Sequence, residues 1–300
     1  MIDIAIIVPF YNEEKIIKSF LNSLNNELKI LEKNVLIVFV DDCSFDKSSD
    51  IVSLFSFNDN ISFVILKHLI NSGNQQAIKT GLRHLSNFDY KRVLIMDSDG
   101  KDNPENIHAL LNTSGDLVVA ARGLRQESYF FKSLYFIYKI LFKLMTGKKH
   151  DFGNFSVMSK SISMQLLESN FIHFSASILK LKIPIKRVRL DKAKRLGETK
   201  TALNFQFFIY HGLYAFLEFS ESIFYKVIKF LLFLILTLIL FSGYVLFQKI
   251  FTQNSIPGWT SSMLIGIGIS ILITFNIIIT GILITYFSKK QNVIKYKEYK

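Results

Sequence analysis

Short apolar runs alternate with single amphipathic helices along the first 125 residues, and this alternation restricts the fold more than any other feature of the chain. The apolar runs lie at residues 4–8, 35–40, 61–66, 92–96 and 117–121. Apolar residues with helical spacing lie between them, most clearly at 13–31 and 72–86. Strands separated by single helices form βαβ units. The sequence therefore predicts an α/β fold with a mostly parallel sheet.

Acidic residues follow three of the predicted strands. Glu13 follows the first strand, Asp41 and Asp42 end the second, and Asp97 and Asp99 follow the fourth. Open α/β sheets bind ligands at the carboxyl ends of their strands. Paired carboxylates suit a hard divalent cation, and burying several of them without a cation is costly. We expect a nucleotide whose base and ribose meet Asp41 or Asp42, with its diphosphate held by a metal at Asp97 and Asp99.

Two long apolar stretches near the C-terminus, at about 225–248 and 262–287, predict transmembrane helices. The core of the first stretch, 227–247, contains one charged residue, Lys229, and 262–287 contains none. Each stretch exceeds the roughly 20 apolar residues that cross a bilayer. The alternative for each is a buried core helix. A domain at 1–215 followed by two spans is the expected organisation.

Charge predicts the orientation of these spans. The loop 248–261 carries one lysine, whereas the tail 288–300 carries five lysines and one glutamate. Because positive charge marks the cytoplasmic side, we expect a multi-pass protein of the cytoplasmic membrane with its catalytic domain and both termini in the cytoplasm. Residues 2–8 already have a strand pattern, so we expect no signal peptide. The net charge of +12 gathers around apolar stretches, which favours anionic lipid headgroups over nucleic acid.

Residues 128–146 are rich in aromatic and aliphatic side chains but also carry Lys132, Lys139 and Lys143 near one helical face. Regular lysines argue against a span, and they favour an amphipathic helix lying in the headgroup layer. The alternative is a helix packed on the sheet with a solvated lysine face. Residues 200–219 have a similar composition, and we expect them to be interfacial too.

Several motifs, taken in order, resemble family 2 glycosyltransferases. They are residues 8–14 (VPFYNEE), 40–46 (VDDCSFD), 71–77 (NSGNQQA), 96–105 (MDSDGKDNPE) and 194–200 (KRLGETK). With two C-terminal spans, the whole chain is similar to the polyprenyl-phosphate glycosyltransferases, the group that includes dolichol-phosphate mannose synthases. The resemblance implies a GT-A fold.

The resemblance also implies an activity and its partners. The implied reaction is inverting transfer of a sugar from a UDP- or GDP-sugar to polyprenyl phosphate (undecaprenyl phosphate in bacteria) at the cytoplasmic membrane face. Mg²⁺ or Mn²⁺ would be held by Asp97 and Asp99. The expected partners are the nucleotide sugar, polyprenyl phosphate and membrane lipids, with no nucleic acid, and a homo-oligomer is left open.

The resemblance assigns roles to individual residues. Nucleotide binding is assigned to Pro9, Tyr11, Glu13, Asp41, Asp42 and Asp97. The catalytic residues implied are Asp99, Asp151 and Asn154. Phosphate or acceptor binding is assigned to Arg122, Arg125, Lys132, Arg187, Arg189, Arg195 and Lys200.

Two residues of the nucleotide motifs depart from the family pattern. Cys43 replaces the usual glycine, which predicts a turn without a positive φ. Lys101 stands where many relatives have a metal-binding glutamine, and a protonated lysine is no ligand. Three alternatives follow: the two aspartates and phosphate hold the metal alone, Asp102 joins them, or Lys101 contacts the diphosphate directly.

The largest departure lies at residues 150–156 (HDFGNFS), where relatives read D-x-G-D-F-R. Asn154 replaces the acceptor-side aspartate and Ser156 replaces the arginine. A lipid phosphate is largely ionised near neutral pH, so Asp151 or Asn154 need only orient it. These changes also leave two other functions open: a membrane-bound GT-A enzyme with another lipid or cell-wall acceptor, and an inactive membrane scaffold of the same fold.

Overall fold

A computed structural model describes residues 1–121, 129–190, 205–251, 258–290 and 296–299. The strands are β1 (Ile2–Phe10), β2 (Val35–Asp41), β3 (Ile61–His68), β4 (Tyr90–Ile95), β5 (Leu117–Ala121), β6 (Phe152–Ser159), β7 (Lys186–Arg189) and β8 (Tyr296–Tyr299). The helices are α1 (Ile17–Ile30), α2 (Ser48–Ser53), α3 (Asn74–Leu85), the 3₁₀ turn η1 (Pro104–Asn106), α4 (Ile107–Asn112), α5 (Tyr129–Thr146), α6 (Lys160–Glu168), α7 (Phe174–Lys180), α8 (Phe205–Glu218), α9 (Ser220–Phe251) and α10 (Trp259–Lys290).

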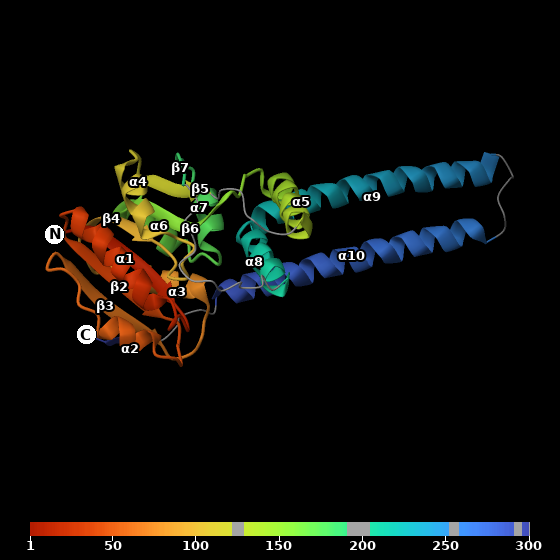
Figure 1. Cartoon of the computed structure of the whole chain (residues 1–300). Helices are drawn as coiled ribbons and strands as arrows, with labels where there is room; N and C mark the ends of the chain where they lie inside the picture. Colours follow the sequence, from red (N-terminus) through yellow and green to blue (C-terminus); the bar gives the residue numbers. More distant parts are fainter. Residues whose placement is uncertain (122–128, 191–204, 252–257, 291–295, 300) are drawn as a thin grey trace. The chain divides into compact units, whose positions relative to one another are not determined.

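The described chain forms two compact units. The first contains Met1–Lys143, Lys148–Glu218 and Val293–Lys300, and the second contains Leu144–Gly147 and Phe219–Asn292. All the strands lie in the first unit, in one sheet of order β7-β5-β6-β4-β1-β2-β3-β8 (Figure 1). The pairs β4–β1, β1–β2, β2–β3 and β5–β7 are parallel, whereas β6 and β8 are antiparallel to their neighbours. The predicted α/β fold with a mostly parallel sheet is confirmed.

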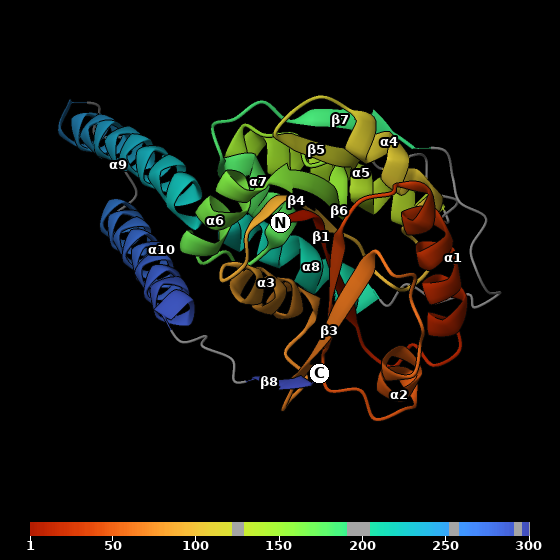
Figure 2. The ribbon, with the colours of Figure 1, turned by 90° about the vertical axis from the view of Figure 1, so that its left-hand side faces the viewer.

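Side chains of β1 alternate between the two faces of the sheet, as the pleat requires. Ile4, Ile6 and Val8 join the core cluster that includes Phe20 and Leu24 of α1. Helix α3 covers the opposite face, where a Cβ on Gly81 would come within 2.6 Å of the Ile7 side chain. Only glycine at position 81 therefore lets α3 approach β1 this closely. Figure 2 shows α1 and α2 on one side of the sheet and α3 and α6 on the other.

The antiparallel strands β6 and β8 were not predicted. Strand β6 lies between β4 and β5, so its first residues reach the edge where β4 ends. Strand β8 pairs with β3 and covers what would otherwise be an open sheet edge (Figure 2). These two strands bring distant parts of the chain onto the parallel core.

The second unit consists mainly of α9 and α10, which lie side by side (Figures 1 and 2). Within the described residues, one helical stretch is long and apolar enough to cross a bilayer: Ser261–Gly281 of α10, with a mean hydropathy of 2.3. It overlaps the second predicted span. The first predicted span, 225–248, lies inside α9 and stays a prediction.

The helices α5 and α8 coincide with the segments predicted to be interfacial. Phe142 of α5 is buried against His150 and Phe216. Other large apolar side chains of the two helices are exposed: Phe136, Ile137, Ile140 and Leu141 on α5, and Ile209, Tyr210, Leu213 and Tyr214 on α8. One face of α5 therefore packs on the protein while apolar residues elsewhere on it face outward. Contact with the headgroup layer stays a prediction.

Candidate active site

Carboxyl groups gather where β1 and β4 end. Burial and the neighbouring negative charge of Asp99 raise the pKa of Glu13 to about 7. Burial and the charge of Asp99 also raise the pKa of Asp97. Asp99 therefore lies close enough to Glu13 and Asp97 to disfavour the ionised forms of these two residues.

Asp97 is held by two side-chain amides. Asn74, the first residue of α3, donates its Nδ2–H to Asp97 Oδ1 at 2.9 Å. Asn154 of β6 donates to the same oxygen at 3.3 Å and to Oδ2 at 3.4 Å. Three segments that are distant in sequence thus meet at Asp97. The contribution of Asn74 was missed, although it lies within the motif at 71–77.

The loop after β4 closes on itself. Gly100 adopts a φ of 75°, and the Lys101 N–H donates to Asp99 Oδ1 at 3.1 Å. The Lys101 ammonium forms an ion pair with Asp99 Oδ2. Asp102 Oδ2 accepts the Asp97 N–H at 2.9 Å, which turns the Asp102 carboxylate back toward the loop backbone.

These contacts take up part of the predicted metal site. Among the described residues, no three His, Cys, Asp or Glu side chains are grouped so as to hold a metal ion. Mg²⁺ and Ca²⁺ take six or more oxygen ligands with free lone pairs. Here an ammonium lies on Asp99, and amide hydrogens lie on Asp97. In this arrangement the Lys101 ammonium and the two amides therefore compete with a divalent cation for the oxygens of Asp99 and Asp97.

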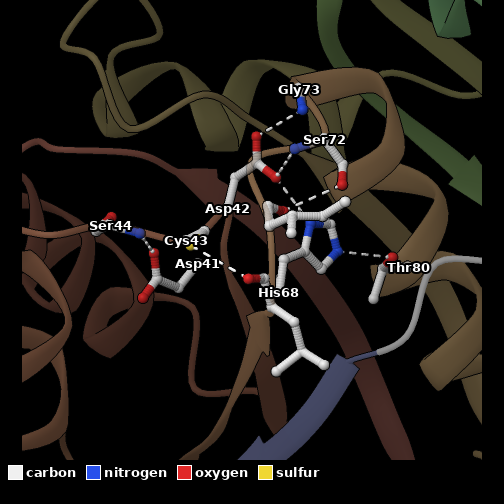
Figure 3. A network of polar contacts seen from close by, with 10 residues as sticks. Asp41, Asp42, Cys43, Ser44, His68, Ser72, Gly73 and Thr80 are labelled. Carbon is white, nitrogen blue, oxygen red and sulfur yellow. Dashed lines mark hydrogen bonds and ion pairs between the residues drawn. The ribbon is translucent and has the colours of Figure 1, made fainter.

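Asp42 anchors the beginning of α3 rather than pointing an unpaired carboxylate outward (Figure 3). The buried carboxylate accepts the Ser72 N–H at 2.8 Å and the Gly73 N–H at 2.6 Å. His68 Nδ1 donates to Asp42 Oδ1 at 2.8 Å, and His68 Nε2 lies 2.9 Å from Thr80 Oγ1. A carboxylate near a helix N-terminus is stabilised by the helix dipole. The predicted nucleotide contact of Asp42 stays a prediction.

Asp41 is fully buried but keeps one oxygen without a hydrogen bond. Its Oδ1 accepts the Ser44 N–H at 2.7 Å, whereas Oδ2 has no hydrogen-bond partner within the described residues. The Lys67 ammonium lies 3.5 Å from Oδ2, which is an ion pair but too long for a good hydrogen bond. Asp41 Oδ2 therefore retains capacity to accept a donor from a ligand.

The turn at Cys43 corrects the sequence prediction. Cys43 has a φ of 68°, so the expected turn without a positive φ is wrong. The left-handed turn lets Asp41 bond Ser44 while the Asp42 side chain reaches Ser72 (Figure 3). The side chain Sγ lies 3.7 Å from the Leu69 carbonyl oxygen. The chain adopts a left-handed turn here without the glycine that favours it.

The segments after β1 and β2 each present one aromatic ring. Tyr11 and the exposed Phe45 meet edge to face, with ring centroids 6.2 Å apart. Asn12 joins the two motifs, because its Oδ1 accepts the Phe45 N–H at 3.0 Å. Asn12 has a φ of 54°, which asparagine tolerates better than most residues. Pro9 is buried, and its carbonyl accepts the Ser98 hydroxyl at 3.1 Å.

The predicted acceptor residues are partly described. Asp151 pairs with Arg187 of β7 (Nε to Oδ1, 3.1 Å) and with Lys149 (Nζ to Oδ2, 3.3 Å). Arg189 is exposed on the same strand, two residues after Arg187. Ser156 is buried, and its hydroxyl donates to the Asn154 carbonyl at 2.9 Å. Ser156 therefore supports the backbone of the motif.

The remaining predicted basic residues are not placed. Arg122, Arg125, Arg195 and Lys200 lie outside the described residues. Lys132 belongs to α5, but the structure does not describe its side chain. The roles assigned to these five residues stay predictions.

Sequence comparison decides the family. The sequence profile of glycosyl transferase family 2 matches residues 5–167, more than half of the chain. The chain belongs to glycosyl transferase family 2. Its matched region contains β1 to β6 and α1 to α5, and therefore Glu13, Asp97, Asp99 and Asn154.

One curated relative is the undecaprenyl-phosphate 4-deoxy-4-formamido-L-arabinose transferase of Serratia proteamaculans. It is 26% identical over 169 residues, which cover 55% of this chain and 50% of the relative. The aligned part of this family 2 chain therefore spans about half the length of that relative.

Two solved structures share the fold at low identity. Glucosyl-3-phosphoglycerate synthase from Mycobacterium tuberculosis, solved with Mn²⁺, UDP-glucose and phosphoglyceric acid, is 14% identical, with a TM-score of 0.51 over 74% of this chain and 80% of that one. Mannosyl-3-phosphoglycerate synthase from Rubrobacter xylanophilus is 13% identical, with a TM-score of 0.52 over 76% and 74%. The first unit of this family 2 chain thus has the GT-A type of α/β fold.

Proposed function

We propose that the chain transfers a sugar from a nucleoside diphosphate to polyprenyl phosphate at the cytoplasmic membrane face, with inversion at the sugar carbon. The observation that carries this proposal is the meeting of Glu13, Asp97, Asp99 and Asn154 at one sheet edge of a family 2 domain. The curated relative that acts on undecaprenyl phosphate supports this class of acceptor.

The donor nucleotide would lie over the ends of β1 and β2. Within the described residues, Asp41 Oδ2 is a buried acceptor with no hydrogen bond, so it would accept an N–H from a nucleobase that displaces the Lys67 side chain. Tyr11 and Phe45 provide exposed aromatic surface beside it, on which a planar base can stack. The diphosphate would then reach the loop at residues 97–102.

The acceptor would approach from β6 and β7. A phosphate monoester is largely dianionic near neutral pH, because its second pKa is about 6. It can attack the sugar carbon without giving up a proton, so the site needs positive charge more than a base. Arg187, held by Asp151, and the exposed Arg189 are suited to bind that phosphate. Asn154 would orient it.

Membrane attachment would come from the second unit. Residues up to Glu218 and residues from Val293 onward belong to the same compact unit. Because Glu218 and Val293 belong to the same unit, they lie on the same side of a bilayer. If α10 crosses the bilayer, the chain between these two residues must cross it a second time, and α9 is the other helix described there. This connectivity supports the predicted pair of spans at 225–248 and 262–287, with the tail 288–300 on the catalytic side. The exposed apolar residues of α5 and α8 support contact with lipid.

The direct test uses the purified full chain in detergent with radiolabelled UDP- and GDP-sugars and undecaprenyl phosphate. The proposal expects a labelled lipid that mild acid releases, and little product from Asp97→Asn. Asp3→Asn is the matched control. Asp3 lies at the start of β1 and pairs with Lys91 at the start of β4, at the opposite edge of the sheet from Asp97. Label entering a glycolipid or a cell-wall precursor instead would indicate another acceptor. Failure to bind any nucleotide sugar would favour an inactive scaffold.

A further inference from the structure

Lys101 is the cation that lies at the end of β4, beside the paired aspartates. Its backbone N–H and its ammonium both contact Asp99, which therefore holds Lys101 by its backbone and by the end of its side chain. The loop that carries it is fixed by the Asp102 contact to the Asp97 N–H and by the Ser98 contact to the Pro9 carbonyl. The ammonium thus has a defined position at the sheet edge where the diphosphate is expected.

The carboxylate oxygens around Lys101 are already engaged. Asp97 Oδ1 accepts two amide hydrogens, and Asp102 Oδ2 accepts a backbone N–H. A metal bound to Asp99 would have to displace the Lys101 ammonium and compete with these donors for the remaining lone pairs. A lysine needs no such rearrangement, because it binds phosphate as a compact point charge.

The ion pair is weak enough to exchange partners. The Lys101 side chain is 56% exposed and the Asp99 side chain 29% exposed. Exposed pairs of this kind contribute little free energy, so moving the ammonium from Asp99 toward a phosphate costs little. A hydrogen bond in which both partners are charged is shorter and stronger than a neutral one.

We propose that Lys101 supplies the positive charge that binds the donor's diphosphate, in place of a divalent cation. This proposal rests on the proposed sugar transfer. In that reaction the bond between the sugar C1 and the diphosphate oxygen breaks, and its electron pair stays on the leaving oxygen. A lone pair of the acceptor phosphate forms the new bond to C1, and no proton moves. Lys101 stabilises the charge on the leaving diphosphate, and Asp99 is its positioning residue.

The test is nucleotide binding by the full chain in detergent, measured by calorimetry with UDP and with GDP. Wild type should bind one of them with the same affinity in EDTA as in Mn²⁺. Lys101→Gln should weaken binding in EDTA by about tenfold or more, the effect of losing one charged hydrogen bond. Lys101→Arg should retain most of the wild-type affinity in EDTA. Lys91→Gln is the matched control, because Lys91 is 57% exposed and pairs with Asp3 at the other end of β4.

A second readout needs no nucleotide. Mn²⁺ binding to the free protein, followed by electron paramagnetic resonance, should be absent in wild type and should appear in Lys101→Gln, where Asp99 loses its ammonium. Wild-type binding of UDP or GDP that EDTA abolishes and Mn²⁺ restores would overturn the role of Lys101 while leaving the proposed transfer standing. Equal nucleotide affinity of Lys101→Gln and wild type in EDTA would also overturn the role of Lys101. No binding of either nucleotide under any condition would overturn both proposals.

Discussion

The side-chain amide of Asn154 donates to both carboxylate oxygens of Asp97, at 3.3 Å and 3.4 Å. The contact exists because β6 runs antiparallel to β4, so the first residues of β6 lie beside the end of β4. It joins the segment 150–156 to the segment 96–105 at one edge of the sheet. An amide at this position gives Asp97 a hydrogen-bond donor, whereas a carboxylate would repel it.

Exchanging that amide for a carboxylate tests this relationship. Asn154→Asp should lower the free energy of unfolding by about 1–3 kcal/mol at pH 8, because a donor is lost and a like charge is added. The loss should shrink near pH 5, where the two carboxyls can share a proton. Thermal unfolding in detergent at both pH values measures it. Asn154→Ala is the control, since it removes the donor without adding charge. A loss independent of pH in both variants would contradict this account.

Asp151 is expected to orient rather than deprotonate. Asp151→Asn keeps the shape of the side chain but weakens its hold on Arg187, so turnover should fall by roughly tenfold with an unchanged pH profile. Turnover against pH with the nucleotide sugar and polyprenyl phosphate is the measurement. Lys149→Gln, which removes the other partner of Asp151, should have a smaller effect. Total loss in Asp151→Asn at every pH would show that the carboxylate acts as a base.

Glu13 should make the protein less stable as the pH rises. Because burial and the charge of Asp99 raise the pKa of Glu13 to about 7, the folded state holds its proton more tightly than the unfolded chain does. The stability of wild type relative to Glu13→Gln should therefore fall between about pH 4 and pH 8, by roughly 1–2 kcal/mol after allowance for partial exposure. Thermal unfolding of both proteins across that range measures the difference. A constant difference would refute the raised pKa.

Cys43 stores backbone strain that glycine would relieve. Cys43→Gly should stabilise the protein by about 0.5–1 kcal/mol, because a left-handed φ costs glycine little. Part of the gain is offset by the greater freedom of glycine in the unfolded chain. Cys43→Val, with a β-branched side chain at the same φ, should destabilise. Chemical denaturation of the three proteins ranks them, and equal stability would argue against strain at this turn.

The two-span topology can be tested by labelling. In a Cys43→Ser background, Ser255→Cys places a thiol in the segment that joins α9 to α10, and Lys18→Cys places one on the exposed face of α1. A membrane-impermeant maleimide applied to intact cells should label the first thiol and leave the second unlabelled until the cells are broken. Labelling of neither thiol, or of both, in intact cells would refute the predicted hairpin.

Local sequence patterns predict the parallel core well. The apolar run before Asp97 and the run before Asp41 identify strand ends, because a short continuous apolar run bounded by polar residues is the local pattern of a buried strand. The Asn154–Asp97 contact could not be predicted in this way, since β6 reaches β4 by a pairing between distant residues. The positive φ at Cys43 was missed because the surrounding hydrogen bonds outweigh the preference of a single residue.

Strand β8 has a consequence for biosynthesis. It is translated only after both long apolar helices, yet it pairs with β3, which leaves the ribosome early. Until then, the outer backbone groups of β3 have no β8 to pair with, and such an edge invites pairing with another nascent chain. Completion of the sheet therefore waits on the synthesis of α9 and α10, so a chain truncated before β8 should aggregate through the edge of β3.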